Sequence, residues 1–436
     1  MANTTRRRII TVFGASGFIG RHLVRRLAKA GWVVRAACRD PEDASFLRTM
    51  GDVGQVIPWG ANVTDPISVH VALNGAEAAV NLVGILYESG NATFQRMHVD
   101  AAKLVAEKAT ELGLKHFVHM SALGADAESD AEYARTKAAG ETAVMAAFPR
   151  ASIVRPSVVF GPEDNFFNMF AGLCRLSPFL PVMGAPTFPR VRLGGEAGFG
   201  VDFLGDGGPK FQPVYVDDVA RAAFVAHAIV TCLQGADAAG QVYELAGPRV
   251  YTFADIMRLL LATTRRRRLL IPVPFWVAEI QAFFMEKLPK PLLTRDQIRL
   301  MQTDNVASGN AKGLADLGIA ATPAEAILRH ILIGSGHKPA NHGLPTAKIN
   351  QYLGGRPLPS PGSSDAAAET INSPNSRRNT EPLTVRCNST LRRSFSSILR
   401  RIKPRSVRRS TARVMAGLET FKSSDKPLTV CGAGVK

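Results

Sequence analysis

The sequence predicts an α/β fold, in which an open, doubly wound parallel sheet is joined to a smaller C-terminal lobe and a disordered basic tail. Three observations lead to this prediction. Short apolar runs alternate with segments of helical spacing up to about residue 155, as in repeated strand–helix units. A glycine-rich turn joins the first strand to the first helix. Beyond about residue 354, polar residues dominate and the apolar period disappears, which is typical of disorder.

The elements expected in the first half alternate regularly. The first strand is expected at Ile9–Phe13, and the helix after it at Arg21–Ala30, where Gly31 is a typical helix stop. Strands that are apolar throughout indicate a parallel sheet with both faces covered by helices. Further strands are expected at Val33–Cys38, Gln55–Pro58, Ala78–Val83, Lys115–Met120 and from Ser152, and further helices at Phe94–Leu112 and Glu132–Ala147.

After Pro156 the pattern loosens. The glycine-rich stretch Gly184–Gly208 is expected to be a loop or an insertion. A strand is expected at Phe211–Val216 with a helix after it, another strand at Gln241–Leu245, and a helix at Phe253–Ala262 capped by Thr252. We therefore expect a sheet domain over residues 7–155, a second lobe over 156–335 interleaved with late sheet elements, and a tail over 354–436.

Charge is unevenly distributed along the 436 residues. The formal net charge is +17, and residues 361–436 carry fifteen Lys or Arg against five Asp or Glu. Such a tail is either a solvated extension or attracted to anionic lipid or nucleic acid. No recognition helix or aromatic sheet motif supports nucleic-acid binding, so we expect none.

Cysteine usage and apolar run lengths bear on the compartment. The five cysteines include no CxxC pair, which disfavours a disulfide framework or a metal site and fits a reducing compartment. The basic and then apolar start of the chain is too short for a secretion signal, and no apolar run has the roughly 18 residues that span a bilayer. We expect a cytoplasmic protein, with a peripheral position on the cytoplasmic face of the inner membrane as a further expectation.

The glycine turn comprises Gly14, Gly17 and Gly20, between an expected strand and an expected helix. The first glycine permits a tight turn, the second lets the backbone approach a pyrophosphate, and the third lets helix and strand pack closely. Free N–H groups at the helix N-terminus then favour phosphate. This context predicts a Rossmann-like site for a nicotinamide dinucleotide.

The end of the second expected strand distinguishes between the two dinucleotides. Cys38 is followed by Arg39 and Asp40. Arg39 is suited to a 2′-phosphate and to stacking on adenine, which favours NADP(H). Asp40 is suited to the free ribose hydroxyls, so NAD(H) remains the alternative.

A Ser–Tyr–Lys set completes the expected site. Tyr133 and Lys137 lie four residues apart on an expected helix and therefore share one face. The lysine is suited to a ribose hydroxyl, and the tyrosine to general acid or base chemistry. Ser121 follows the fifth strand, at the sheet edge where ligands gather, and is either a substrate contact or a turn cap.

Taken together, these motifs resemble the short-chain dehydrogenase/reductase superfamily, and more narrowly the nucleotide-binding accessory subunits of respiratory complex I and their bacterial relatives. The resemblance covers roughly residues 7–335. It rests on GASGFIG (14–20), NLVGILYE (81–88), SALGADAESDAEYARTKAAGE (121–141), RPSVVFGPEDNFFNMFA (155–171), FQPVYVDDVARA (211–222) and YELAGPRVYTF (243–253).

The resemblance implies a role for each matched position. The pyrophosphate would lie on the glycine turn, the 2′-phosphate on Arg39, and the nicotinamide and its ribose against Tyr133, Lys137 and Pro156. It also implies a structural rather than redox-active NADPH. The remaining positions implied to contact the dinucleotide are Ser16, Phe18 and Ile19 on the turn, Asn62 and Val63 beside adenine, and Leu82, Val83 and Gly84 along its centre.

A basic run and an aromatic segment follow one another in the second half. Arg265–Arg268 precedes Ile271–Trp276 and Ala282–Met285. This pattern suits a membrane interface or docking on a membrane-bound complex, and equally a buried helix with a basic face.

Three functions remain open from the sequence. The first is an NADP(H)-binding accessory or assembly subunit of complex I, and the second is a free NAD(P)-dependent reductase, dehydratase or epimerase that uses Tyr133, Lys137 and Ser121. The third is a dinucleotide-sensing regulator without chemistry.

Overall fold

The computed structural model describes residues 8–186, 190–192, 200–232, 240–288 and 291–334. The tail expected over residues 354–436 lies outside the described residues. No helix in the described part of the chain has both the length and the apolar character needed to cross a membrane.

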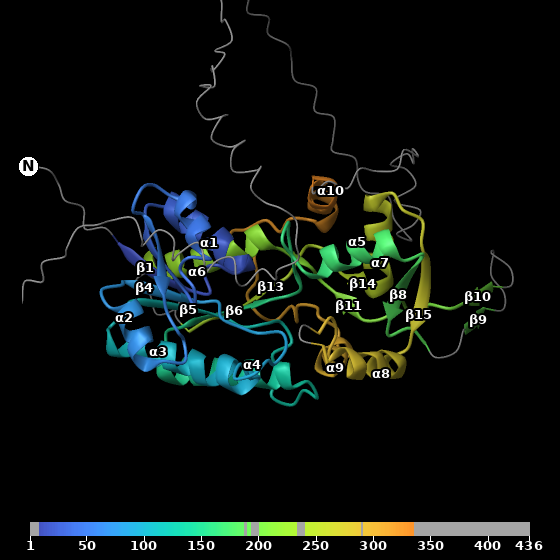
Figure 1. The fold of residues 1–436 in the computed structure, drawn as a ribbon, viewed down its shortest axis with the longest axis horizontal. Helices are drawn as coiled ribbons and strands as arrows, with labels where there is room; N and C mark the ends of the chain where they lie inside the picture. Colours follow the sequence, from blue (N-terminus) through green and yellow to red (C-terminus); the bar gives the residue numbers. More distant parts are fainter. Residues whose placement is uncertain (1–7, 187–189, 193–199, 233–239, 289–290, 335–436) are drawn as a thin grey trace, which may run out of the picture. The chain divides into compact units, whose positions relative to one another are not determined.

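Seven parallel strands form the central sheet in the order β13-β6-β5-β4-β1-β2-β3 (Figure 1). β1 lies between β2 and β4. From it the sheet grows through β2 and β3 on one side, and through β4, β5, β6 and β13 on the other. The expected doubly wound parallel sheet is therefore confirmed. The strands are β1 (Ile9–Phe13), β2 (Val33–Cys38), β3 (Val56–Gly60), β4 (Ala78–Asn81), β5 (His116–Met120), β6 (Ser152–Pro156) and β13 (Val242–Leu245).

Helices cover both faces of this sheet (Figure 1). α1 (Phe18–Lys29) and α6 (Val216–Cys232) pack on the face that buries Ile10 and Val12 of β1. On the other face, Phe13 packs in a core built with α2 (Pro66–Leu73), α3 (Ala101–Glu111) and α4 (Glu132–Ala147). Alternate residues of β1 thus serve opposite faces, as the period of two in a strand requires.

The helix expected over Phe94–Leu112 contains a π-helical turn, Gln95–Asp100, before α3 begins. α4 crosses this turn at Gly140, where a Cβ atom would lie 2.2 Å from the carbonyl oxygen of His98. Extra turns of this kind occur often at functional sites, because they redirect a side chain without ending the helix.

A second hydrophobic core lies beyond the sheet and is rich in phenylalanine. α7 (Phe253–Thr264) crosses this core, and its expected N-cap Thr252 forms a reciprocal capping box with Asp255. The other elements around this core are α5 (Phe166–Leu176), β8 (Phe179–Met183), β15 (Leu269–Val273), α8 (Phe275–Met285), α9 (Arg295–Met301) and α10 (Ala324–Gly334).

Two expectations for the second half need correction. The single strand expected at Phe211–Val216 is two short strands, β11 (Lys210–Phe211) and β12 (Val214–Tyr215), which pair with different partners. Pro213 separates them, because proline has no N–H to donate to a ladder. The stretch Gly184–Gly208, expected to be a loop or an insertion, contains the antiparallel pair β9 (Arg190–Arg192) and β10 (Gly200–Asp202), so it is not a plain loop.

Candidate functional site

The glycine turn forms a tight cradle between β1 and α1. Gly14 has a φ of +77°, which favours glycine, and its N–H donates to the carbonyl of Ala37 on β2. A Cβ atom on Gly20 would lie 2.3 Å from the carbonyl oxygen of Gly14, so α1 packs directly on the turn. Gly17 is the N-cap of α1 and has no side chain to cap it, and the first turn carries no acidic residue. These helix N–H groups are therefore suited to an anion.

The three other residues of the turn take different positions. Ser16 is partly exposed, whereas Ile19 packs against the core beneath the sheet. Phe18 lies against Gly161, where a Cβ atom would be 2.9 Å from its ring. Gly161 belongs to the FGPED segment, whose Asp164 carboxylate accepts hydrogen bonds from the N–H groups of Gly161 and Phe167. That segment therefore packs against the glycine turn through Phe18.

Arg21 is a basic residue at the turn that the sequence patterns did not single out. Its guanidinium donates to the carbonyls of Ser16, at 3.2 Å, and Gly17, at 3.4 Å. It also lies over the ring of Phe46, 5.2 Å from the centroid. No motif distinguishes one arginine on the exposed side of a helix, so only the structure reveals this position.

At the end of β2, Arg39 is exposed and Asp40 has a local role. The Asp40 carboxylate accepts hydrogen bonds from the backbone N–H groups of Glu42, at 2.9 Å, and Asp43, at 3.4 Å. One of its oxygens is therefore already used as the acceptor in a local turn. Both side chains are exposed, but of the two only the Asp40 carboxylate forms hydrogen bonds within the described residues.

At the end of β3, Asn62 and Val63 differ in exposure. The Asn62 side chain is exposed, and its carbonyl oxygen accepts from the Thr64 N–H at 3.1 Å. Val63 is buried in the core beside α2 and α3.

The loop after β4 meets the glycine turn. A Cβ atom on Gly14 would lie 3.3 Å from the Leu82 carbonyl carbon, and the Val83 N–H donates to the side-chain oxygen of Asn81. A Cβ atom on Gly84 would lie 3.1 Å from the Lys137 ammonium nitrogen. The structure thus brings the turn, this loop and the Tyr–Lys helix together at the centre of the sheet.

Tyr133 and Lys137 lie on the first turns of α4, as expected, with the Lys137 Nζ 5.9 Å from the tyrosine ring centroid. Burial raises the pKa of Tyr133 to about 12, so the phenol is protonated at neutral pH. Burial also lowers the pKa of Lys137 to about 8, although the nearby Glu141 opposes this effect. At neutral pH a protonated phenol therefore lies beside the Lys137 ammonium.

Lys137 is only 4% exposed, and within the described residues its ammonium donates to one acceptor, the Met120 carbonyl at 3.4 Å. An ammonium group has three N–H donors. Buried donors without acceptors are costly, so this group is suited to an additional oxygen ligand such as a ribose hydroxyl.

Two buried histidines adjoin Lys137, and the sequence patterns did not reveal them. His98 on the π-turn pairs with Thr136 through Nδ1, stacks on Phe94 and meets the Tyr133 ring edge-on. Burial, and then the charge of Lys137, lower the pKa of both His98 and His119 to about 3, so both are neutral. No motif around either histidine indicates a function.

Ser121 is 4% exposed and follows β5 directly. Its hydroxyl, like Nε2 of His119, has no hydrogen-bond partner among the described residues. Its backbone N–H donates to Val154 on β6, the strand that ends at Pro156. Ser121 and Pro156 therefore lie at neighbouring strand ends, on the same sheet edge as the glycine turn.

These features together fit a nicotinamide dinucleotide. The glycine cradle and the uncapped α1 N-terminus suit the pyrophosphate, and the under-partnered Lys137 and Ser121 suit polar groups at the other end. No group of metal-ligating side chains occurs within the described residues.

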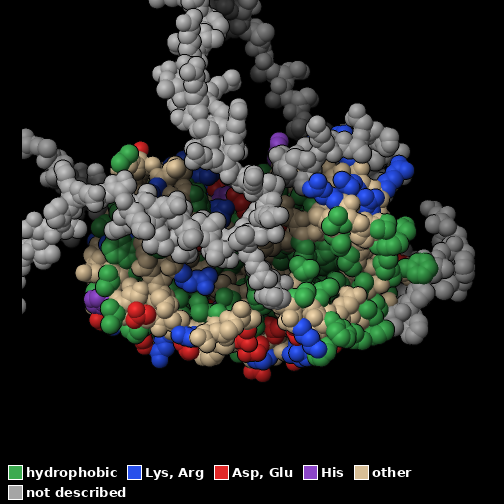
Figure 2. Space-filling model, viewed as in Figure 1, with side chains coloured by type: hydrophobic (Ala, Val, Ile, Leu, Met, Phe, Trp, Pro, Cys, Tyr) green, Lys and Arg blue, Asp and Glu red, His purple; other side chains and the backbone are tan. Residues whose placement is uncertain are grey.

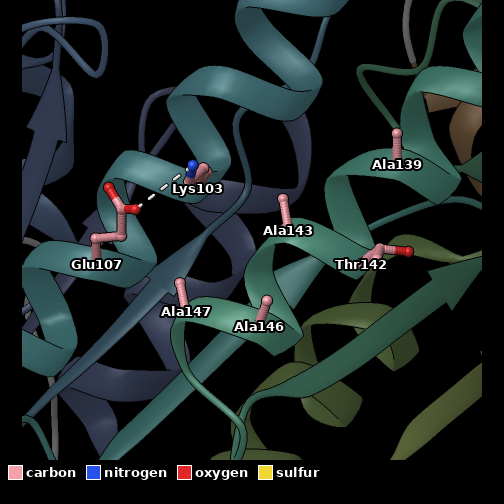
Figure 3. Close-up of a pocket in the computed structure, with 7 residues that line it drawn as sticks. All are labelled: Lys103, Glu107, Ala139, Thr142, Ala143, Ala146 and Ala147. Carbon is pink, nitrogen blue, oxygen red and sulfur yellow. Dashed lines mark ion pairs between the residues drawn. The ribbon is translucent and has the colours of Figure 1, made fainter.

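A separate depression of about 490 Å³ lies between α3 and α4 (Figure 3). It offers few groups that could bind a ligand specifically, because its α4 side is mostly alanine and its α3 side is the Lys103–Glu107 ion pair. None of the expected dinucleotide contacts lines it.

An exposed apolar face forms a second feature of the molecule. Figure 2 shows hydrophobic side chains gathered at one end, with a group of Lys and Arg beside them. In α8, Ala278 and Ala282 are buried, whereas Trp276 and Phe284 are 56% and 63% exposed. We call the exposed side of α8 the α8 face; its other exposed members are Ile280 and Phe283.

Comparisons with known proteins agree with this site. Residues 14–159 match the family model described as NAD(P)H-binding. The fold resembles that of the NADPH-dependent quinone oxidoreductase QOR2 from Escherichia coli, with a TM-score of 0.55 and 18% identity over 75% of this chain and 99% of that one.

Two curated relatives extend the similarity beyond the sheet. The chain is 34% identical to "NADH dehydrogenase [ubiquinone] 1 alpha subcomplex subunit 9, mitochondrial" of Arabidopsis thaliana, over 71% of this chain and 74% of that protein. It is 30% identical to the "NADH-ubiquinone oxidoreductase 40 kDa subunit, mitochondrial" of Neurospora crassa, again over 71% and 74%. With its NAD(P)H-binding segment and Rossmann-like sheet, the chain belongs to the family of alpha subcomplex subunit 9 of NADH:ubiquinone oxidoreductase.

Proposed function

We propose that the protein is an NADP(H)-binding accessory or assembly subunit of respiratory complex I, in which a tightly held cofactor is a structural part. The observation that carries the proposal is the extent of the similarity to complex I subunits. It spans 323 residues, so it includes second-lobe elements as well as the dinucleotide-binding segment. A dinucleotide-binding sheet alone would support only the superfamily.

The proposed contacts follow the dinucleotide from one end to the other. Arg39 binds the 2′-phosphate, and the commitment of an Asp40 oxygen to a turn favours NADP(H) over NAD(H). Arg21 reinforces the phosphate side of the turn. The remaining proposed contacts are Gly14, Ser16, Gly17, Phe18, Ile19 and Gly20 at the pyrophosphate, Asn62 and Val63 at adenine, Leu82, Val83 and Gly84 at the centre, and Tyr133, Lys137 and Pro156 at the nicotinamide ribose and ring.

The chain's own groups at the nicotinamide end bind rather than exchange protons. The Tyr133 hydroxyl keeps its proton at neutral pH and is therefore a hydrogen-bond donor to the bound dinucleotide. Lys137 contributes its unused donors to the ribose hydroxyls. A bound nicotinamide dinucleotide supplies hydride-transfer chemistry, but a structural role requires only that these groups orient it.

The α8 face is the surface that we propose to meet the membrane-bound complex. A patch of exposed aromatic and aliphatic side chains of this kind marks an interaction site on a soluble domain. Its basic neighbours support our proposal that the protein lies at the anionic cytoplasmic surface of the inner membrane. The protein is then peripheral, held by complex I subunits or by the adjoining lipid surface.

A free NAD(P)-dependent reductase, dehydratase or epimerase is the second candidate. The buried hydroxyl of Ser121, which has no partner among the described residues, favours it, because a substrate carbonyl or hydroxyl would satisfy that group. Tyr133 would then serve as the acid, with Lys137 beside it.

Replacement of Tyr133 by Phe tests one candidate against the other. Under the subunit proposal, Y133F still binds NADPH and still co-purifies with NADH:quinone oxidoreductase activity from detergent-solubilised native membranes. R39A binds NADPH more weakly, by about tenfold or more, and its co-purification falls with it. If Y133F instead abolishes NADPH oxidation by a quinone or carbonyl compound while binding persists, the enzyme candidate replaces the subunit proposal.

A further inference from the structure

The helix that carries Tyr133 and Lys137 is capped from the second lobe. The N-cap residue of α4 is Ala131, which offers no side-chain acceptor. The cap comes instead from Asp296, whose two carboxylate oxygens accept hydrogen bonds from the N–H groups of Glu132, at 2.6 Å, and Tyr133, at 3.0 Å. Helix N-termini ordinarily take this acceptor from a nearby residue.

Asp296 is held at two helix N-termini at once. It lies in the first turn of α9, whose own N-cap Thr294 forms a capping box with Gln297. Both helix ends place a partial positive charge near this carboxylate. The contact therefore joins α4 and α9 by a charge-assisted pair of hydrogen bonds.

The segment from Asp296 to Asn305 reaches three other parts of the proposed cofactor site. The Gln297 amide donates to the Leu86 carbonyl, at 3.4 Å, in the loop that begins at Leu82. The Asn305 amide donates to the Leu123 carbonyl at 3.1 Å, and its side-chain oxygen accepts from the Ser157 hydroxyl at 2.6 Å. Loops that follow β4, β5 and β6 are thus attached to one segment.

The same segment, together with the preceding Arg295, is attached to α8. The Glu286 carboxylate, at the end of α8, accepts from the Arg295 N–H at 2.6 Å and from its Nε at 2.9 Å. The Gln302 amide donates to Glu279 of α8 at 3.3 Å. Figure 1 shows α4, α9 and α8 side by side along the lower edge of the molecule, in agreement with the contacts between these helices.

From this connection we infer that Asp296 is a positioning residue that links occupancy of the dinucleotide site to the order of the α8 face. The inference rests on the proposed function, because it takes the cofactor at Tyr133 and Lys137 and the docking surface on α8. A dinucleotide bound to Tyr133 and Lys137 fixes the first turns of α4. It therefore also fixes the two N–H groups that donate to Asp296. Through α9 it also restricts α8. Coupling of binding equilibria is reciprocal, so a partner that holds the α8 face tightens cofactor binding by the same factor.

The test compares D296N with D255N in the full chain, using NADPH as the probe. Asparagine keeps one acceptor oxygen but places an N–H₂ group against the second helix N–H. Asp255 is the matched control, because it belongs to the capping box of α7 in the same lobe and contacts Thr252 and Arg258 rather than the site. The measurements are the NADPH dissociation constant and amide hydrogen exchange of α8 and α9 with and without NADPH.

In the wild type, NADPH slows amide exchange in α8 and α9. D296N binds NADPH about tenfold more weakly, and at saturating NADPH it shows no such slowing in α8. D255N keeps the cofactor-dependent slowing and binds NADPH within about twofold of wild type.

A purely structural cap would lower the stability of D296N equally with and without NADPH and leave its NADPH affinity unchanged, and that result overturns the inference. Slowing of α8 exchange in D296N equal to that in the wild type overturns it as well. Failure of the wild type to bind NADPH at all is a different result, because it refutes the proposed function itself.

Discussion

Replacement of Lys137 by Met is predicted to stabilise the protein while it weakens the cofactor site. Burial lowers the pKa of Lys137 from 10.5 to about 8, so its ammonium is protonated at pH 7 but at a cost to the folded state. Each pKa unit corresponds to about 1.4 kcal/mol, so the cost is about 3 kcal/mol. Methionine has a similar volume and no charge, and K137M therefore gains up to that amount in free energy of unfolding at pH 7.

The pH dependence follows from the same lowered pKa. Between pH 8 and 10.5 the unfolded chain holds a proton on Lys137 that the folded protein has lost, so this group makes wild-type stability rise with pH across that range. The K137M variant lacks this rise. Urea unfolding at pH 7, 9 and 10.5 measures the difference in free energy of unfolding between the wild type and K137M. The other titrating groups are the same in both proteins, so their contributions cancel in this difference.

The control for this prediction is K103M on the neighbouring helix. Lys103 has a half-exposed side chain and an exposed ion pair with Glu107, and such pairs contribute about 0–1 kcal/mol. K103M is expected to change stability little and to bind NADPH as the wild type does. A K137M variant that is less stable than the wild type at pH 7 without cofactor would refute the reasoning.

The other predictions concern the glycine turn and the end of β2. G20A is expected to lose about 1–3 kcal/mol of stability and most of its NADPH affinity, because its Cβ would lie 2.3 Å from the Gly14 carbonyl oxygen. G172A in α5 is its control, since a Cβ there meets nothing within 4 Å and the helix should gain up to about 1 kcal/mol; urea unfolding and NADPH titration measure both. R39A is expected to weaken NADPH binding by about tenfold or more, because a hydrogen bond to a charged group contributes roughly 1.5–3 kcal/mol. NADH binding should stay nearly unchanged, since NADH has no 2′-phosphate. Equal losses for the two dinucleotides in calorimetry would contradict the assignment of the 2′-phosphate to Arg39.

The parts of the site that the sequence predicted are those set by local structure. The strand, glycine turn and helix around Gly14 occupy adjacent residues, so their spacing carries the geometry. The bounds of α4, Glu132–Ala147, agree with the prediction. Tyr133 and Lys137 then share a face because of helix geometry alone.

The parts that could not be predicted depend on contacts between distant residues. Asp296 caps a helix 164 residues earlier in the chain, and nothing in the local pattern around it indicates that partner. His98 reaches the site because a π-turn redirects it, and the same sequence window is compatible with an ordinary helix. The raised pKa of Tyr133 likewise comes from burial, which spacing does not report.

The energetics of the site explain why a dinucleotide would be held as a structural part. A buried ammonium with one acceptor and a buried hydroxyl with no partner among the described residues both disfavour the folded state by themselves. A ligand that supplies oxygen acceptors to these groups recovers that free energy only when bound, and at a given concentration it stabilises the fold more the tighter it binds. The same groups that make the site costly therefore make retention of the cofactor favourable.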